Sequence, residues 1–344
     1  MKIQKNEKRK ERITYIDTAK CLVILFMILG HIIIYFRGLG NDHPQLLIFI
    51  HSFHMPAFFI FSGLFFKKEK IEKQSFKNFV TSKFKSLIIP YLFLDISGGI
   101  IDSILNKNFS FKIILKILKK TFSLDPNMGS NWFLLSLFIG SIILYFVIKY
   151  YKEWFKYFII SIVLLFSFHR IYIGGGEITT IVFFLRGIIG FIFMYLGYSL
   201  KDYYFNDYNK RVDIIIVAAI LLAVIMNING QIDIWSCTIN NPIYMILGGI
   251  VGTFLIIGIS KNIDNRFFQF IGRNTITIMG THYILIENLY KLLKLGSGDK
   301  SFIILFLSLL LIEIPWIYLY EKYIPFLIGK KDRNFTSLLK NNNL

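Results

Sequence analysis

Long apolar runs separated by short polar segments dominate the chain. Most runs are close to the roughly 20 residues that a helix needs to cross a bilayer core. They fall at residues 15–36, 44–66, 86–106, 132–149, 155–169, 179–200, 212–228, 242–260, 271–290 and 301–320. This pattern predicts an all-α, polytopic integral membrane protein with about ten transmembrane helices.

The same pattern predicts one membrane domain over residues 1–344. It would consist of a basic arm (1–14), a helical bundle (15–321) and a tail (322–344). The first apolar run is too long for the apolar region of a signal peptide and no small-residue cleavage site follows it, so we expect a retained helix.

The basic residues predict the orientation of the chain. The sequence has 39 lysines and arginines against 21 acidic residues, a net charge of +18. With the N-terminus inside, most of the basic residues fall in cytoplasmic segments, as the positive-inside bias requires. We therefore expect both termini in the cytoplasm and a location in the cell membrane, that of a bacterium. Because the basic residues border apolar spans, no nucleic-acid partner is expected.

Composition excludes an ordinary soluble protein. Hydrophobic residues make up 55% of the chain, charged residues 17%, and the mean hydropathy is +0.57. Soluble domains do not need that much apolar surface. Of the two cysteines, Cys21 lies near the start of the first span and Cys237 in a loop expected on the opposite face, so we expect no disulfide between them.

The first span carries three ionisable residues, Asp17, Lys20 and His31. At about 100° per residue, Lys20 and His31 lie about 20° apart around the helix, and Asp17 lies about 40° from His31. A polar stripe of this kind normally faces a bundle interior or a wet cavity. In the alternative interpretation, Asp17 and Lys20 mark the cytoplasmic interface and His31 the outer one.

The second span contains HSFHMPAFFIFSG. His51 and His54 are three residues apart and share one face of the helix. Pro56 cannot donate a hydrogen bond to the carbonyl of Ser52 and should bend the helix beside them. No further acidic, histidine or cysteine ligand follows at metal-binding spacing, so no metal is predicted. Hydrogen bonding between helices is the alternative role for these histidines.

Arg186 lies inside the apolar stretch FFLRGIIGF. A guanidinium in a membrane span costs at least about 2.5 kcal/mol on insertion scales, so it needs a partner or a ligand. We favour a role facing a ligand. The alternative is an ion pair with a carboxylate such as Asp95 or Glu287.

Three more polar or aromatic residues are candidates for a site. His282 lies just beyond the middle of the ninth predicted span, and Asn274 lies toward its cytoplasmic end. Trp132 follows an outer loop directly, where tryptophan often belongs to the interfacial belt.

Residues 109–122 (FSFKIILKILKKTF) form an amphipathic pattern before the fourth span. The lysines at 112, 116, 119 and 120 fall on one helical face, and isoleucine and leucine fill the other. We expect a helix that lies in the outer membrane interface. Attraction of an anionic, lipid-linked substrate is an alternative function.

Six segments, taken in this order, resemble the membrane-bound acyltransferase-3 family, whose members O-acetylate sugars and cell-surface polysaccharides. They are RITYIDTAKCLVILFMILGH, HSFHMPAFFIFSGLFF, SKFKSLIIPY, NWFLLSLF, RGIIGFIFMYLGY and FIGRNTITIMGTHY. The stretch HMPAFFIFSG is most similar to the branch described as fucose 4-O-acetylase-like. The resemblance covers nearly the whole chain.

The resemblance implies roles for several residues. The family has a basic residue followed, after ten residues, by a histidine, and Lys20 and His31 match this motif. It implies that His31 is catalytic and that Lys20 helps to place the acyl donor. With Asp17 from the same polar stripe, these are the residues that we predict to be catalytic. The family's arginine-rich loop before the third span is matched by Lys83 and Lys85, which would bind the donor without the bidentate grip of arginine.

Together these observations predict a membrane O-acyltransferase that moves an acetyl group from acetyl-CoA to a hydroxyl of a sugar or cell-surface glycan. His31 would take the hydroxyl proton or carry the acyl group transiently. The partners are membrane lipid, acyl-CoA and the glycan, and the oligomeric state stays open. A transporter or flippase that uses the same charged residues is the alternative. The residues expected to bind the acceptor are His51, His54, Trp132, Arg186, Asn274 and His282.

Overall fold

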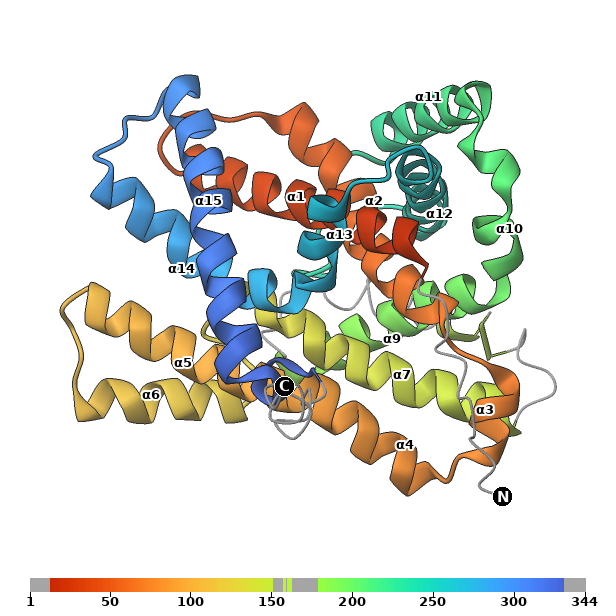
Figure 1. The fold of residues 1–344 in the computed structure, drawn as a ribbon, viewed down its shortest axis with the longest axis horizontal. Helices are drawn as coiled ribbons and strands as arrows, with labels where there is room; N and C mark the ends of the chain where they lie inside the picture. The colour runs from red at the N-terminus through yellow and green to blue at the C-terminus, as the bar shows by residue number, and fades with distance from the viewer. Residues whose placement is uncertain (1–12, 151–156, 159, 163–178, 331–344) are drawn as a thin grey trace, which may run out of the picture.

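The computed structural model describes residues 13–150, 157–158, 160–162 and 179–330. These residues form a bundle of helices (Figure 1), and the only bridge between extended segments in them pairs Asp233 with Thr238. The longer helices are α1 (Thr14–Arg37), α2 (Pro44–Leu64), α5 (Ile89–Leu105), α6 (Phe111–Phe122), α7 (Trp132–Tyr150), α9 (Thr179–Ser199), α11 (Val212–Asn229), α12 (Pro242–Ser260), α14 (Thr275–Leu292) and α15 (Asp299–Tyr323). The shorter elements are α3 (Lys68–Lys73), α4 (Phe76–Lys83), η1 (Phe84–Ile88), η2 (Gly129–Asn131), α10 (Lys201–Phe205), η3 (Asp207–Lys210), α13 (Arg266–Arg273) and η4 (Pro325–Ile328).

Eight helical segments in the described part of the chain are long and apolar enough to cross a membrane. They are Thr14–Arg37, Pro44–Leu64, Phe76–Leu105, Gly129–Tyr150, Val182–Ser199, Val212–Asn229, Pro242–Ser260 and Asp299–Tyr323. The prediction of an all-α polytopic membrane protein is therefore confirmed.

Two of the ten predicted spans are absent from this set. The span predicted at 271–290 forms the helix α14, but several of its polar side chains, among them Thr277, Thr281 and His282, are buried inside the bundle and lower its hydropathy. The span predicted at 155–169 lies largely outside the described residues, as do residues 1–12 of the arm and residues 331–344 of the tail.

Glycines allow the central helices to approach closely. A Cβ atom on Gly63 of α2 would overlap the carbonyl of Met194 in α9, and one on Gly197 of α9 would overlap the carbonyl of Ile60 in α2. Small residues at such crossings let the two backbones touch, which is how helices associate in membranes. The pair fixes α2 against α9.

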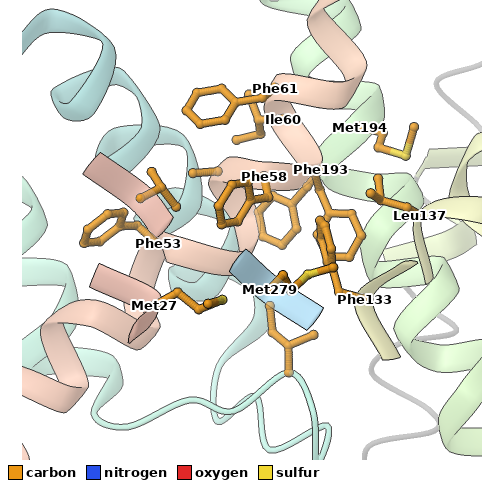
Figure 2. Packing of buried hydrophobic residues seen from close by; sticks show 14 of the residues in the cluster. Met27, Phe53, Phe58, Ile60, Phe61, Phe133, Leu137, Phe193, Met194 and Met279 are labelled. Atoms are coloured by element: carbon orange, nitrogen blue, oxygen red, sulfur yellow. The ribbon is translucent and has the colours of Figure 1, made fainter. Parts of the chain in front are cut away.

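An aromatic cluster fills the space between α2, α7 and α9 (Figure 2). The ring of Phe133 lies 4.7 Å from that of Phe59 and 5.8 Å from that of Phe58, centroid to centroid. Phe193 is fully buried in the same cluster. The first turn of α7, which begins at Trp132, is therefore fixed in position by buried aromatic packing.

Pro56 lies inside α2, as the sequence indicates. Proline leaves the carbonyl of Ser52 without its usual helical donor. That carbonyl faces Gly248 of α12, whose missing side chain lets the two helices come close. The proline thus lies at a helix contact immediately after His51 and His54.

The segment 111–122 forms the predicted amphipathic helix, α6, which lies side by side with α5 (Figure 1). Its buried residues Ile117 and Thr121 pack on α5, whereas Phe111 and Phe122 are exposed together with Lys112, Lys116 and Lys119 of the basic face. The end of α6 is attached to α5 because Thr121 Oγ1 donates to Asp95 at 2.6 Å.

Candidate functional site

Helices α1, α2 and α14 bring their histidines to one place. A cavity of about 250 Å³, which we call the histidine cavity, lies there. Its lining includes His31, His51, His54, Trp132, Trp235 and Tyr283. The side chains from α1 and α2 reach it because their helical spacing turns them to the faces that meet, as the sequence predicts.

His31 lies between the cavity and α14. Its ring is 5.1 Å from the ring of His282 and 5.5 Å from that of Tyr283, measured between centroids. His282 is fully buried, and its Nδ1 atom donates to the carbonyl of Ile278 at 2.9 Å. Among the described residues, the Nε2 atom of His282 has no hydrogen-bond partner. The imidazole of His282 can therefore position or relay a proton beside His31.

His51 and His54 form a second pair, with ring centroids 5.2 Å apart. Nδ1 of His51 lies 2.8 Å from the carbonyl of Ile232, and Nδ1 of His54 lies 2.8 Å from that of Ile50. A carbonyl oxygen can only accept, so both Nδ1 atoms carry the proton. In the neutral rings, Nε2 is then the atom that can accept a hydrogen bond from a bound hydroxyl.

Arg186 does not line the cavity but contacts two residues that do, Trp132 and Trp235. Its Nε donates to the backbone carbonyl of Trp235 at 2.7 Å, and its guanidinium carbon lies 5.5 Å from the ring centroids of both Trp132 and Trp235. Trp132 is only 6% exposed and lines the cavity, so it does not stand in a lipid-facing belt. Stacking between two indoles offsets part of the cost of a cation at this depth.

The carboxylates considered as partners of Arg186 have other contacts. Asp95 accepts hydrogen bonds from Thr121, Asn127 and Asn131, which tie α5 to the segment before α7. Glu287 accepts from Lys291 on the next turn of α14 at 2.6 Å. The alternative pairing of Arg186 with either carboxylate thus gains no support.

The loop between α11 and α12, residues 230–241, closes one side of the cavity and was not anticipated from the sequence. Ile232, Asp233, Ile234 and Trp235 all line the cavity. The loop is held in shape by the Asp233–Thr238 bridge, and Trp235 N donates to Asp233 Oδ1 at 3.0 Å. A polar loop that carries a tryptophan between two apolar spans was the available signal.

Cys237 is a buried residue of this loop, so its reactivity tests whether the loop stays closed. Both cysteines are free thiols, and Cys237 is 3% exposed. Burial raises the pKa of the Cys237 thiol to about 11. Only the thiolate reacts with alkylating reagents. The thiol should therefore be almost unreactive at pH 8 in the folded protein.

We expect iodoacetamide to leave Cys237 unlabelled at pH 8 in a Cys21→Ser background, and to label it fully after denaturation. Because the raised pKa keeps the thiol protonated, the labelling rate should climb about tenfold per pH unit from pH 8 to 10. Mass spectrometry of the tryptic peptide measures this rate. Labelling at pH 8 as fast as in the denatured protein would show that the loop opens freely.

A second cavity, of about 200 Å³, lies between residues 65–74, which follow α2 and include α3, and the helical turns of α4 and η1. Lys67, Lys70 and Lys83 line it together with aromatic residues, and we call it the lysine cavity. Nζ of Lys83 stands 4.8 Å from the ring centroid of Phe66. The sequence pairs Lys83 with Lys85, but Lys85 is exposed and outside this lining.

Lys20 and Asp17 lie toward the same end of the bundle as the lysine cavity. Nζ of Lys20 is 5.6 Å from the ring centroid of Phe65, which itself lines that cavity. Asp17 is buried, with its Oδ2 4.0 Å from Nε of Arg273 in α13. At 3.6 residues per turn, the two residues therefore lie about three to four helical turns before His31 in α1.

Asn274 lies apart from the histidine cavity. It is buried between α13 and α14, donates to the carbonyl of Phe270 at 2.9 Å and accepts from Lys330. These contacts join the end of the bundle to the segment after α15. They give Asn274 a role in packing rather than in the cavity.

Glu313 was missed by the sequence reasoning, although an acidic residue in the apolar stretch FIILFLSLLLIEIPW is a recognisable signal. It is 1% exposed in α15. Thr281 Oγ1 donates to its carboxylate at 2.8 Å, next to His282 in the chain. A buried carboxylate thus supports the turn of α14 that carries His282.

Within the described residues, no group of three or more histidine, cysteine or acidic side chains is arranged to hold a metal ion. The lining of the histidine cavity includes the imidazole nitrogens of His31, His51 and His54. They can accept, donate or move a proton next to a bound hydroxyl.

Residues 13–322 match the family model described as an acyltransferase domain, one of the acyltransferase-3 type. Searches of curated proteins and of solved structures found no match. The matched range includes both cavities and all of the helices from α1 to α14.

Proposed function

The chain belongs to the membrane acyltransferase-3 family, and from this membership and the histidine cavity we propose that it is an O-acyltransferase that moves an acetyl group from acetyl-CoA to a hydroxyl of a sugar or cell-surface glycan. The observation that carries the proposal is that His31, His51 and His54 line one cavity. His282 lies next to His31, and Arg186 lies against Trp132 of the lining. The proposed acceptor hydroxyl would lie in this cavity.

In the proposed reaction, His31 takes the proton of the acceptor hydroxyl while its oxygen attacks the thioester carbonyl. The new C–O bond forms and the C–S bond breaks, and the proton held by His31 passes to the CoA thiolate. A covalent route uses the same residue, because an imidazole nitrogen of His31 can first accept the acetyl group and then lose it to the hydroxyl. A donor that lines the cavity, such as the Tyr283 hydroxyl or the indole N–H of Trp132, would stabilise the oxyanion in either route.

The lysine cavity is the proposed site for the CoA phosphates. Three ammonium groups line a space next to aromatic rings, and cations of this kind bind phosphate oxygens through charge-assisted hydrogen bonds. Lys20 borders the same space through Phe65. Donor binding and acceptor chemistry would then occur at opposite ends of α1 and α2.

Acyl transfer is tested directly by incubating the purified protein with radiolabelled acetyl-CoA and a panel of glycans. Label should appear on a glycan in the presence of the protein. A transporter or flippase binds and moves its substrate but transfers no label, so a panel without labelled product would contradict the proposal.

Replacing Lys67, Lys70 and Lys83 together by glutamine should raise the KM for acetyl-CoA about tenfold or more and leave the KM for the acceptor unchanged, since only the donor carries phosphates. Lys77→Gln is the matched control, because Lys77 is exposed on α4 outside the lining. An unchanged donor KM in the triple variant would place the phosphates elsewhere.

A further inference from the structure

The histidine cavity has room for a small acceptor only. At about 250 Å³ it is below the roughly 300–1,000 Å³ of pockets that enclose a drug-sized ligand. A single sugar ring fits such a volume, whereas the rest of a glycan has to leave through the mouth. Residues that line the cavity and are also exposed mark that mouth, and Trp235 is 50% exposed and Tyr283 43%.

The indole of Trp235 is held in place at this mouth. Arg186 covers one face of the ring, with its guanidinium carbon 5.5 Å from the centroid. The backbone on both sides is also fixed, because Trp235 O accepts from Arg186 and Trp235 N donates to Asp233. An exposed aromatic ring in a fixed orientation loses little conformational entropy when a ligand binds to it.

The same loop is coupled to the histidines. Nδ1 of His51 donates to the carbonyl of Ile232, three residues before Trp235. A ligand that packs on Trp235 is therefore positioned relative to His51 by one short stretch of backbone. None of the residues that line the lysine cavity belongs to this loop.

We propose that Trp235, presented by the loop 230–241, is the platform on which a pyranose ring of the acceptor stacks, so that this loop sets acceptor orientation and selectivity. The inference rests on the proposed function and deepens it. A pyranose presents a face of C–H groups, which packs on the electron-rich face of an indole, while its hydroxyls stay at the edge for the histidines. A linear polyol has no such face.

The experiment compares Trp235→Leu and Trp235→Phe with wild type. Leucine removes the aromatic face, whereas phenylalanine keeps a smaller one, and the backbone contacts of the loop persist in both. Tyr318→Leu is the matched control, because Tyr318 is 60% exposed on α15 and outside the cavity lining. Two quantities are measured: the KM for acceptor and for acetyl-CoA, and direct glycan binding by calorimetry without donor.

The binding probes are methyl glycosides of a hexose, a 6-deoxyhexose and an N-acetylhexosamine, with sorbitol as the polyol without a ring. Trp235→Leu should raise the acceptor KM and the glycoside Kd about tenfold, and Trp235→Phe should recover part of the loss. The donor KM should not change, and sorbitol should bind weakly to every variant. Tyr318→Leu should match wild type.

Several outcomes would overturn the platform. If Trp235→Leu has the same acceptor KM and the same glycoside Kd as wild type, stacking of the sugar on Trp235 is excluded. A reduced amount of membrane-inserted protein with unchanged constants would identify Trp235 as an interfacial anchor instead. If the wild type binds glycosides through Trp235 but transfers no label, the proposed acyltransferase reaction fails while the platform stands, so the two failures are distinguishable.

Discussion

Replacing His31 by glutamine should abolish acyl transfer and leave the protein in the membrane. Glutamine has a similar length and can hydrogen-bond, but it can neither take the hydroxyl proton nor carry an acetyl group. General-base catalysis by one side chain contributes about 10²–10⁴-fold, so the rate should fall by at least that range. The surrounding packing should change little, because His31 is only half-buried and faces a cavity.

The measurement is the initial rate of label transfer from acetyl-CoA to the acceptor, normalised to the amount of protein in the membrane. His43→Gln is the matched control, since His43 lies in the segment between α1 and α2 and faces Asp299 at 3.4 Å rather than the cavity. His43→Gln should keep full activity. Substantial transfer by His31→Gln would remove His31 from the chemistry and leave His51 or His54 as the base.

The polar faces of the individual helices could be predicted from the sequence, because they depend only on helical period. The positions of His31 in α1 and of His51 and His54 in α2 follow from that period. Which faces meet depends on close helix contacts such as the one between Gly63 and Met194, and a single sequence does not specify the partner of such a contact. The histidines could therefore be predicted as candidate site residues, but not that they lie around one cavity.

The sequence was least informative where the backbone leaves regular helix. The loop 230–241 has no periodicity, so neither its fold over the cavity nor the contact of Arg186 with Trp235 could be predicted. The lysine cavity shows the same difficulty, because Lys67 and Lys70 lie before α4 and meet Lys83 only after the chain has turned. The family resemblance pointed to Lys83 together with Lys85, which lies outside this cavity.

Transfer should require acetyl-CoA and the acceptor on opposite faces of the membrane. The two cavities lie at opposite ends of the same helices, since the lysine cavity includes Phe65, just after α2, and the histidine cavity includes His51, near its start. At 1.5 Å per residue, these positions are about 21 Å apart along the helix, a large part of a bilayer core of about 30 Å. The extended pantetheine arm of CoA is long enough to reach from one toward the other.

This arrangement predicts a vectorial reaction, which sealed vesicles of known orientation can test. Membrane-impermeant acetyl-CoA is added to the face that carries the N-terminus, and an impermeant glycan acceptor to the other face. We expect labelled glycan in that arrangement. When both substrates are placed on the acceptor face, we expect no labelled glycan. Adding a pore-forming peptide, which lets acetyl-CoA cross the membrane, should then restore transfer. The positive-inside bias predicts that most basic segments lie on the N-terminal side, where they should hold the donor phosphates by charge. Equal transfer with both substrates confined to one face of intact vesicles would refute the cross-membrane reaction without affecting the role of His31.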